Sequence, residues 1–212
     1  MFTGIIEETA KIISISPQSG KKLLRIARPL AFDDIKIGSS IACDGICLTV
    51  LDFDKTSFSV EIMHETLDKS TAKSWLIGRM LNLERAMILG GRMDGHWLQG
   101  HVDRDLRVIS HQKIAGTDYL RFELINADRA LLVPQGSVAI NGVSLTIAEL
   151  RSDYFSVALI GHTLSETNLS SLKASDRINV EYDIVGKYLV RLQVAGDRLM
   201  KHTYSFRGND VQ

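Results

Sequence analysis

The sequence predicts an all-β protein built from two tandem antiparallel barrels and a C-terminal helix. Three observations support this prediction: an internal repeat, short apolar runs separated by glycine, aspartate and proline within each copy, and a heptad-like apolar pattern confined to the last segment. Several short strands in fewer than about 100 residues favour a closed or nearly closed barrel, because closure hides the edges that an open sheet exposes.

The internal repeat covers a large part of each copy. Residues 39–50 (SSIACDGICLTV) align without gaps on residues 136–147 (GSVAINGVSLTI), which is an offset of 97. The same offset pairs Phe58 with Phe155, Thr66 with Thr163, Asn82 with Asn179, and Glu84 with Glu181. One constant offset over such a distance indicates a duplicated structural unit.

The start of each copy fixes the boundary between the units. Gly4 pairs with Gly100 at an offset of 96, so a single insertion separates this block from the later one. We therefore place the first barrel at residues 1–97 and the second at residues 98–186.

The strands within each copy follow from alternation. Phe58, Val60 and Ile62 alternate with smaller or polar residues, which is the period of two that half-buried strands show. Further apolar runs occur at residues 10–15, 23–27, 41–51, 81–83 and 155–159. Gly45 and Gly142 lie inside the repeated strand block, where a glycine indicates a bulge or a closely approaching ligand.

The last segment has a different pattern. Val185, Leu189, Leu192 and Leu199 follow heptad-like spacing, which predicts a helix over residues 187–202. This helix could cover its own barrel or hold several copies of the chain together. We expect residues 203–212, a polar tail, to be disordered.

Composition excludes several classes of protein. Lys plus Arg and Asp plus Glu each number 25, so no excess of positive charge predicts nucleic acid as a partner. No apolar run is long enough to span a membrane, and we expect a cytoplasmic protein. Cys43 and Cys47 are too few for a disulfide framework, and the six histidines are scattered, so we expect reduced thiols and no metal site.

Several motifs, taken together, resemble riboflavin synthase. They are residues 1–6 (MFTGII), the paired blocks 45–49 (GICLT) and 142–146 (GVSLT), Gly95-His96, residues 100–103 (GHVD), and the Thr-Leu pairs at 66–67 and 163–164. The resemblance covers residues 1 to about 190. Their joint order and spacing are specific, whereas each motif alone is weak.

The resemblance implies an architecture and a reaction. Each chain would form two six-stranded Greek-key barrels, each with a shallow site for one 6,7-dimethyl-8-ribityllumazine, and the C-terminal helix would hold a homotrimer. The working site would lie between the first barrel of one subunit and the second barrel of another. The family uses no cofactor and no metal, and an association with lumazine synthase stays open.

Joining two identical substrates requires one nucleophile and one electrophile, so the two sites should differ in their side chains. In the alignment of the two copies, Cys47 corresponds to Ser144, Ile5 to His101, and Ala86 to Asp183. Titratable and polar groups therefore concentrate in the second copy.

We assign candidate catalytic roles to four residues. The 7-methyl group of the lumazine is acidic because its anion delocalises into the ring, and His101 is the candidate to assist its deprotonation. Ser144 could add to C7 of the acceptor lumazine or orient a water, with Asp183 raising its nucleophilicity through a hydrogen bond. Cys47 could act similarly if its thiolate fraction is raised, although a buried thiol without assistance is inert. A purely structural role is the alternative for each.

The substrate contacts follow partly from alternation and mostly from the resemblance. Thr49 and Thr146 lie two residues beyond Cys47 and Ser144, so each pair points to one face of its strand. The expected contact residues are Phe2, Gly4, Ile5, Ile6, Ser40, Cys47, Leu48, Thr49, Glu61, Ile62, Met63, His64, Glu65, Thr66, Gly100, His101, Val102, Gln135, Ser144, Leu145, Thr146, Ile160, Gly161, His162, Thr163, Leu164 and Ser165. Gln135 and His162 depart from the family pattern, which often has lysine and glutamate there.

Two other functions compete with this prediction. A non-catalytic lumazine- or flavin-binding protein of the fluorescent type shares the layout but loses the polar groups of one half, whereas this chain keeps them. A flavin-dependent oxidoreductase would need a nicotinamide domain, and no Gly-x-Gly-x-x-Gly turn is present to open one.

Overall fold

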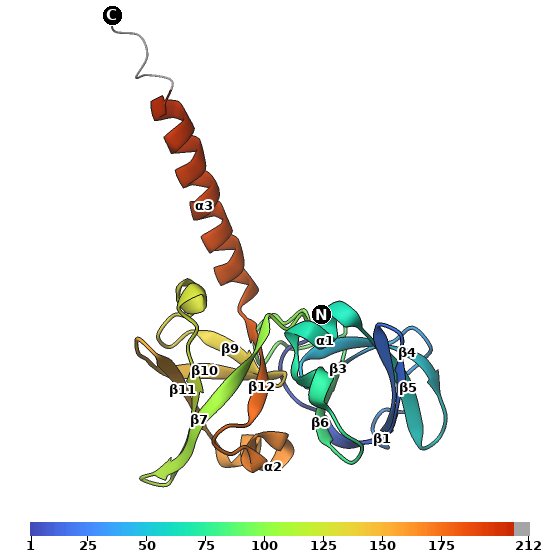
Figure 1. Cartoon of the computed structure of the whole chain (residues 1–212). Helices are drawn as coiled ribbons and strands as arrows, with labels where there is room; N and C mark the ends of the chain where they lie inside the picture. The colour runs from blue at the N-terminus through green and yellow to red at the C-terminus, as the bar shows by residue number, and fades with distance from the viewer. Residues whose placement is uncertain (206–212) are drawn as a thin grey trace, which may run out of the picture.

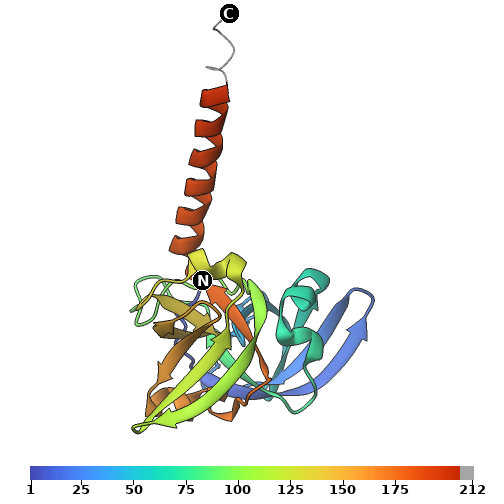
Figure 2. The ribbon, with the colours of Figure 1, turned by 60° about the vertical axis from the view of Figure 1, so that its left-hand side comes forward.

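The protein consists of two closed six-stranded antiparallel barrels side by side, with a long helix leading away from them (Figures 1 and 2). This computed structural model describes residues 1–205, and side chains as far as residue 195. The strands of the first barrel are β1 (Glu8–Gln18), β2 (Lys21–Ala27), β3 (Ser40–Cys43), β4 (Ile46–Phe53), β5 (Ser57–Met63) and β6 (Met80–Arg85). Those of the second are β7 (Arg104–Ile114), β8 (Thr117–Glu123), β9 (Ser137–Ile140), β10 (Val143–Leu150), β11 (Tyr154–Leu159) and β12 (Arg177–Tyr182).

The two barrels share one topology, as the repeat predicts. The first closes in the order β1-β2-β5-β4-β3-β6, and the second runs through the equivalent strands β7-β8-β11-β10-β9-β12. Short helices α1 (His64–Lys69) and η1 (Thr71–Ser74) lie between β5 and β6. Their counterparts α2 (Gly161–Glu166) and η3 (Asn168–Ser171) lie between β11 and β12, and η2 (Asn126–Leu131) joins β8 to β9.

Each barrel has its own apolar core, and alternation decides which side chains enter it. In β4, Ile46, Leu48 and Val50 are buried, whereas Cys47 is partly exposed and Thr49 is exposed. Strand β10 shows the same pattern over its first six residues, with Ser144 partly exposed and Thr146 exposed. The expected shared face of each pair is therefore confirmed, and it is the outer surface of the barrel.

The segments that precede the two barrels cross between them. Phe2 and Leu98 form an antiparallel bridge with N···O distances of 2.8 and 3.1 Å. Beyond this bridge, the segment that leads into the first barrel contacts β10 of the second, where Ser144 N donates to Gly4 O at 2.8 Å. The segment that leads into the second barrel contacts β4 of the first, where Cys47 N donates to Gly100 O at 2.9 Å. We call residues 1–6 the first lead segment and residues 97–102 the second.

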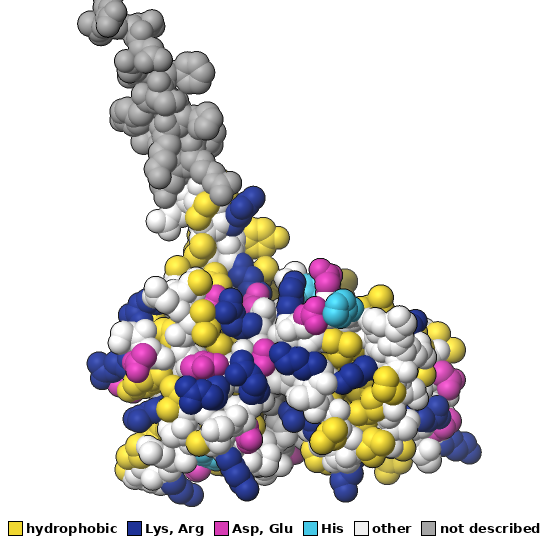
Figure 3. Space-filling view, viewed as in Figure 1, with side chains coloured by type: hydrophobic (Ala, Val, Ile, Leu, Met, Phe, Trp, Pro, Cys, Tyr) yellow, Lys and Arg dark blue, Asp and Glu magenta, His cyan; other side chains and the backbone are white. Residues whose placement is uncertain are grey.

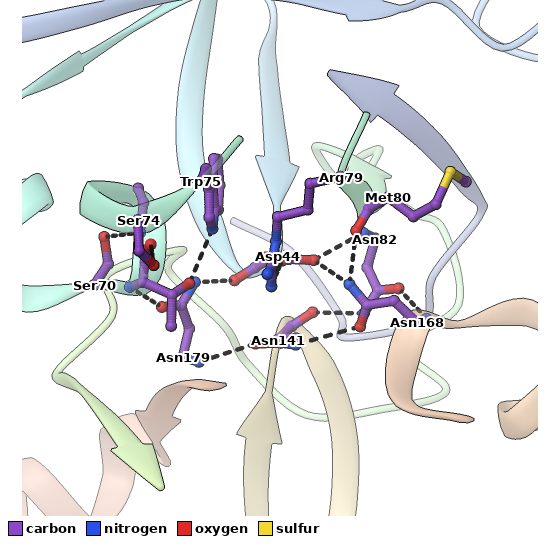
Figure 4. Close-up of polar contacts among 12 residues, drawn as sticks. Asp44, Ser70, Ser74, Trp75, Arg79, Met80, Asn82, Asn141, Asn168 and Asn179 are labelled. Carbon is purple, nitrogen blue, oxygen red and sulfur yellow. Dashed lines mark hydrogen bonds and ion pairs between the residues drawn. The ribbon is translucent and has the colours of Figure 1, made fainter. Parts of the chain in front are cut away.

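A buried polar network closes the seam between the barrels (Figure 4). Asn82 Nδ2 donates to Asn141 O at 3.0 Å, and the repeat-related Asn179 Nδ2 donates to Asp44 O at 2.8 Å. Each asparagine thus spans the seam and satisfies a backbone carbonyl of the opposite barrel. Buried carbonyls need such partners, so this reciprocal pair fixes how the barrels meet.

The paired glycines of the repeat lie on the same seam. A Cβ atom on Gly45 would come within 2.8 Å of Gly142 N, and a Cβ on Gly142 within 2.8 Å of Gly45 N. Both residues have positive φ, +79° and +81°. The expected bulge is wrong, because each glycine lies in the turn between two regularly paired strands. The group that approaches each glycine closely is the backbone of the other barrel.

The C-terminal helix α3 (Ile184–Ser205) begins three residues earlier than predicted. It contacts η2 near its start and then projects away from the barrels (Figures 1 and 2), so the alternative that it covers its own barrel is wrong. Val185, Tyr188, Leu189 and Leu192 are each more than half exposed. The tail expected to be disordered overlaps α3 at residues 203–205, and the rest of it lies outside the described residues.

The face of the molecule in Figure 3 carries side chains of both charges, interspersed over the two barrels. Apolar side chains gather at the base of α3 on the same face. Within residues 1–205, no helix is both long and apolar enough to cross a membrane.

Candidate active site

The first candidate site is a cavity of about 270 Å³ on the outside of the first barrel. It lies where β4, α1 and the second lead segment meet, and it is lined by Ile46, Cys47, Glu65, Thr66, Lys69, Gly100, His101 and Val102. Six of these eight residues belong to the contacts expected from the sequence. The cavity is concave, with a mixed polar and apolar lining, as small-molecule sites are.

His101 lies in this first site, and not beside Ser144. Our expectation that polar groups concentrate in the second copy is wrong for this residue, because the second lead segment crosses to the first barrel. The backbones are in contact there: a Cβ atom on Gly100 would approach the backbone nitrogen of Cys47 to 2.7 Å. Only glycine permits this close approach. As a result, the next residue, the exposed His101, lies beside Cys47.

The second candidate site is the corresponding surface of the second barrel, around Ser144 on β10. Here the first lead segment takes the equivalent place, since a Cβ atom on Gly4 would approach Ser144 Cβ to 2.6 Å. By the repeat, Ile5 and Ile6 stand where the first site has His101 and Val102, and His162 stands in place of Glu65. The two sites are built from equivalent strands and lead segments, and they differ in their charged groups.

Ser144 has a histidine partner that the sequence did not assign. His96 Nδ1 lies 2.6 Å from Ser144 Oγ, and the His96 side chain is buried. Burial lowers the pKa of His96, against the opposing effect of the Asp183 charge, so the imidazole is neutral near pH 7. A neutral imidazole can accept the hydroxyl proton of Ser144, which is how a serine is activated for addition.

Asp183 does not contact Ser144 as we expected. Its Oδ1 accepts a hydrogen bond from Val185 N at 2.9 Å, which is a cap on the first turn of α3. Its charge acts instead on His96, whose protonated form it favours. The carboxylate therefore acts on the histidine that contacts Ser144.

The remaining expected contacts divide by the direction of their side chains. Leu48, Ile62 and Leu145 point into the barrel cores, so only their backbones could meet a ligand. Phe2 is buried with Leu98 between the barrels, so its side chain belongs to the packing of the seam. Partly or fully exposed side chains belong to Ile5, Ile6, Ser40, Thr49, Glu61, Met63, His64, Glu65, Thr66, Thr146, Ile160, His162, Thr163, Leu164 and Ser165.

Gln135 lies on an exposed turn and has a positive φ of +65°. Its counterpart in the first copy is Gly38, with φ of +90°. The position therefore keeps the left-handed backbone of the repeat although the residue is not glycine. A side chain there extends from the turn before β9.

Two features of the site escaped the sequence analysis, the role of His96 and the crossing of the lead segments. Gly95 was the available hint for the placement of His96. A Cβ atom there would lie 1.9 Å from Thr3 O, so this glycine lets the chain fold His96 against the first lead segment. The pairing of Gly4 with Gly100 in the repeat gave the second hint.

Comparison with known proteins agrees with the duplicated site. The family model described as lumazine binding domain matches residues 3–86 and again residues 99–183. Riboflavin synthase of Bacillus subtilis (strain 168) is 39% identical over 191 residues, which cover 90% of this chain and 89% of that protein. The chain belongs to the riboflavin synthase family. Riboflavin synthase of Brucella abortus (strain 2308) is 38% identical over 91% of this chain and 98% of its own length. The chain is thus an enzyme of the riboflavin synthase family.

Solved structures of a related protein share the fold. LumP complexed with riboflavin superposes with a TM-score of 0.79 at 22% identity, covering 86% of this chain and 99% of that one. LumP complexed with 6,7-dimethyl-8-(1'-D-ribityl) lumazine gives 0.77 at 22% identity, covering 85% and 98%. At 22% identity this likeness supports the fold of the chain, but it does not assign roles to individual residues.

Proposed function

We propose that this enzyme converts two molecules of 6,7-dimethyl-8-ribityllumazine into riboflavin and 5-amino-6-ribitylaminouracil. One observation carries the proposal: the chain holds two sites of the same construction that differ in their reactive groups. The first presents Cys47 and His101, and the second presents Ser144 backed by His96. Such a pair suits a reaction in which one compound serves both as donor and as acceptor.

The reaction transfers a four-carbon unit from one lumazine to the other. The two products together contain all the atoms of the two substrates, so no oxidant, reductant or other reagent enters. The protein has to bind both molecules, remove protons from methyl groups and activate one ring for attack. General acid–base groups and a nucleophile are sufficient for these tasks.

At the second site we assign Ser144 to the acceptor lumazine. Neutral His96 accepts the Ser144 proton while the hydroxyl adds to C7, or while it orients a water that adds there. The bond of 2.6 Å is already within the range for such a transfer. Asp183 stabilises the resulting imidazolium through its charge.

At the first site we assign His101 to the deprotonation of the 7-methyl group. His101 is exposed at the rim of the cavity, beside Cys47 and Thr66, and an imidazole can exchange protons with solvent there. Cys47 faces the same cavity with its thiol partly exposed, so it can contact the pteridine ring.

We further propose a homotrimer held by α3. The exposed apolar side chains of Val185, Tyr188, Leu189 and Leu192 give the helix a face with no partner in the described part of the chain. Exposed apolar stripes of this kind are buried by association with other helices. Assembly would let the first site of one subunit face the second site of another.

A single assay separates the enzyme from a lumazine-binding protein. Purified protein is mixed with 6,7-dimethyl-8-ribityllumazine as the only substrate, and the products are quantified by chromatography. We expect riboflavin and 5-amino-6-ribitylaminouracil in equal amounts. Tight binding with no product would replace this proposal with the fluorescent-binder alternative.

A further inference from the structure

Two buried glutamates stand at equivalent places in the two barrels. Glu84 is near the end of β6 and 4% exposed, and its repeat partner Glu181 is near the end of β12 and 3% exposed. A carboxylate this deeply buried requires compensating hydrogen bonds or a paired cation. Among the described side chains, neither glutamate forms an ion pair within 4 Å, so hydrogen bonds carry the compensation.

The donors to both carboxylates come from the lead segments. Glu84 accepts from Thr3 N at 2.6 Å, Thr3 Oγ1 at 2.8 Å and Gly4 N at 3.0 Å. Glu181 accepts from Gln99 N at 2.8 Å, Gly100 N at 3.0 Å and His101 N at 3.2 Å. Each carboxylate therefore fixes the lead segment of its own barrel with three hydrogen bonds.

Each lead segment is bound by the glutamate of its own barrel but completes the candidate site of the other barrel. The residues bound by Glu84 continue into the Ser144 site of the second barrel, and those bound by Glu181 continue into the Cys47 site of the first. The carboxylates thus lie on the opposite side of the seam from the sites that their segments complete.

We propose that Glu84 and Glu181 are positioning residues that act across the seam, Glu84 for the Ser144 site and Glu181 for the Cys47 site with its His101. The inference rests on the proposed function, because it takes both surfaces to be lumazine sites. It extends the mechanism to two buried residues that act through the lead segments they bind.

Charge and geometry both favour a carboxylate at these positions. Three N–H or O–H donors converge on each group, and a carboxylate accepts them all, whereas a glutamine amide would turn its own N–H groups toward some of them. Burial raises the pKa of both glutamates, and the hydrogen bonds from the lead segments oppose that rise. The charges facing Glu84 include Glu7, and those facing Glu181 include Lys187 and Asp103.

The test needs a separate measure of lumazine binding at each site, and alkylation of a cysteine in that site provides it. Cys47 lines the first site, whereas Cys43 is fully buried, so iodoacetamide should alkylate Cys47 alone. Protection of Cys47 by 6,7-dimethyl-8-ribityllumazine then measures occupancy of the first site. The double variant Cys47→Ser/Ser144→Cys moves the same reporter to the second site, and mass spectrometry of the full-length protein reads both.

Each glutamate is then changed to glutamine in both backgrounds. We expect Glu181→Gln to raise the lumazine concentration that half-protects Cys47 about tenfold or more, with little change at the position-144 reporter. Glu84→Gln should give the reverse pattern. Thr3→Ala, which removes one donor to Glu84 at a partly exposed position, should weaken only the second site and by less.

Three outcomes would overturn the inference. The first is that a glutamine substitution weakens lumazine binding at the site of its own barrel, and the second is that it weakens binding at both sites equally. The third is that it leaves binding at both sites unchanged although lumazine protects the wild-type protein. If a glutamine variant does not fold, the Thr3→Ala result decides: a loss confined to the second site supports the crossed assignment, and any other pattern refutes it. Failure of lumazine to protect the wild-type protein at either reporter would instead refute the proposed function.

Discussion

Asn179 at the seam between the barrels offers the clearest test of how the two units are held together. Its side chain is 1% exposed, accepts from Thr71 N at 2.7 Å and donates to Asp44 O at 2.8 Å. Replacing it with alanine leaves both buried backbone groups without these partners. Each buried group without a partner costs about 1–3 kcal/mol, so Asn179→Ala should lower the free energy of unfolding by about 2–6 kcal/mol.

Urea denaturation followed by circular dichroism measures this loss. We expect a lower midpoint at an unchanged slope, because the surface exposed on unfolding stays the same. Asn126→Ala is the matched control, since Asn126 is exposed and its side chain forms no hydrogen bond with the described residues. A loss under about 1 kcal/mol for Asn179→Ala, or an equal loss for the control, would refute the reasoning.

Further predictions concern the seam and the two sites. Gly45→Ala should lower the free energy of unfolding by more than Gly20→Ala does. Both positions have positive φ, but only at Gly45 would the new Cβ clash, because it would lie 2.8 Å from the backbone of the other barrel. Equal losses in urea titrations would contradict this prediction. Ser144→Ala and His101→Ala should reduce kcat roughly 100-fold or more while lumazine affinity changes little, and parallel losses in both would indicate mere positioning. Because burial lowers the pKa of His96, its neutral form persists below the ordinary value of 6.5. In the His101→Ala variant, which removes the other proposed base, the acid limb of kcat/KM against pH should therefore fall below 6.5, and a limb above that value would contradict the role of His96.

Local and periodic features of the structure could be predicted from the sequence. The shared direction of Cys47 and Thr49 followed from alternation along one strand, and the matching direction of Ser144 followed from the constant offset of the repeat. The structure adds that this face is the outer surface of the barrel. The same offset predicted that both barrels share one strand order, which the structure confirms. These inferences needed only neighbouring residues or the comparison of two copies.

The composition of each site depends on contacts between distant parts of the chain, and these escaped prediction. His101 belongs to the first barrel's site because residues 97–102 cross the seam, and no local pattern records that path. His96 reaches Ser144, 48 residues away, because Gly95 allows two segments to touch. The start of α3 was missed for a local reason: Asp183 caps it, and we had assigned that carboxylate to Ser144.

Two lumazine sites on every chain, one per barrel, are the physical requirement of the proposed reaction. Calorimetric titration of the Ser144→Ala variant with 6,7-dimethyl-8-ribityllumazine measures their number directly, because turnover should be slow there. We expect two molecules bound per chain at saturation. A stoichiometry of one per chain would contradict the proposal that the duplicated surface brings donor and acceptor together.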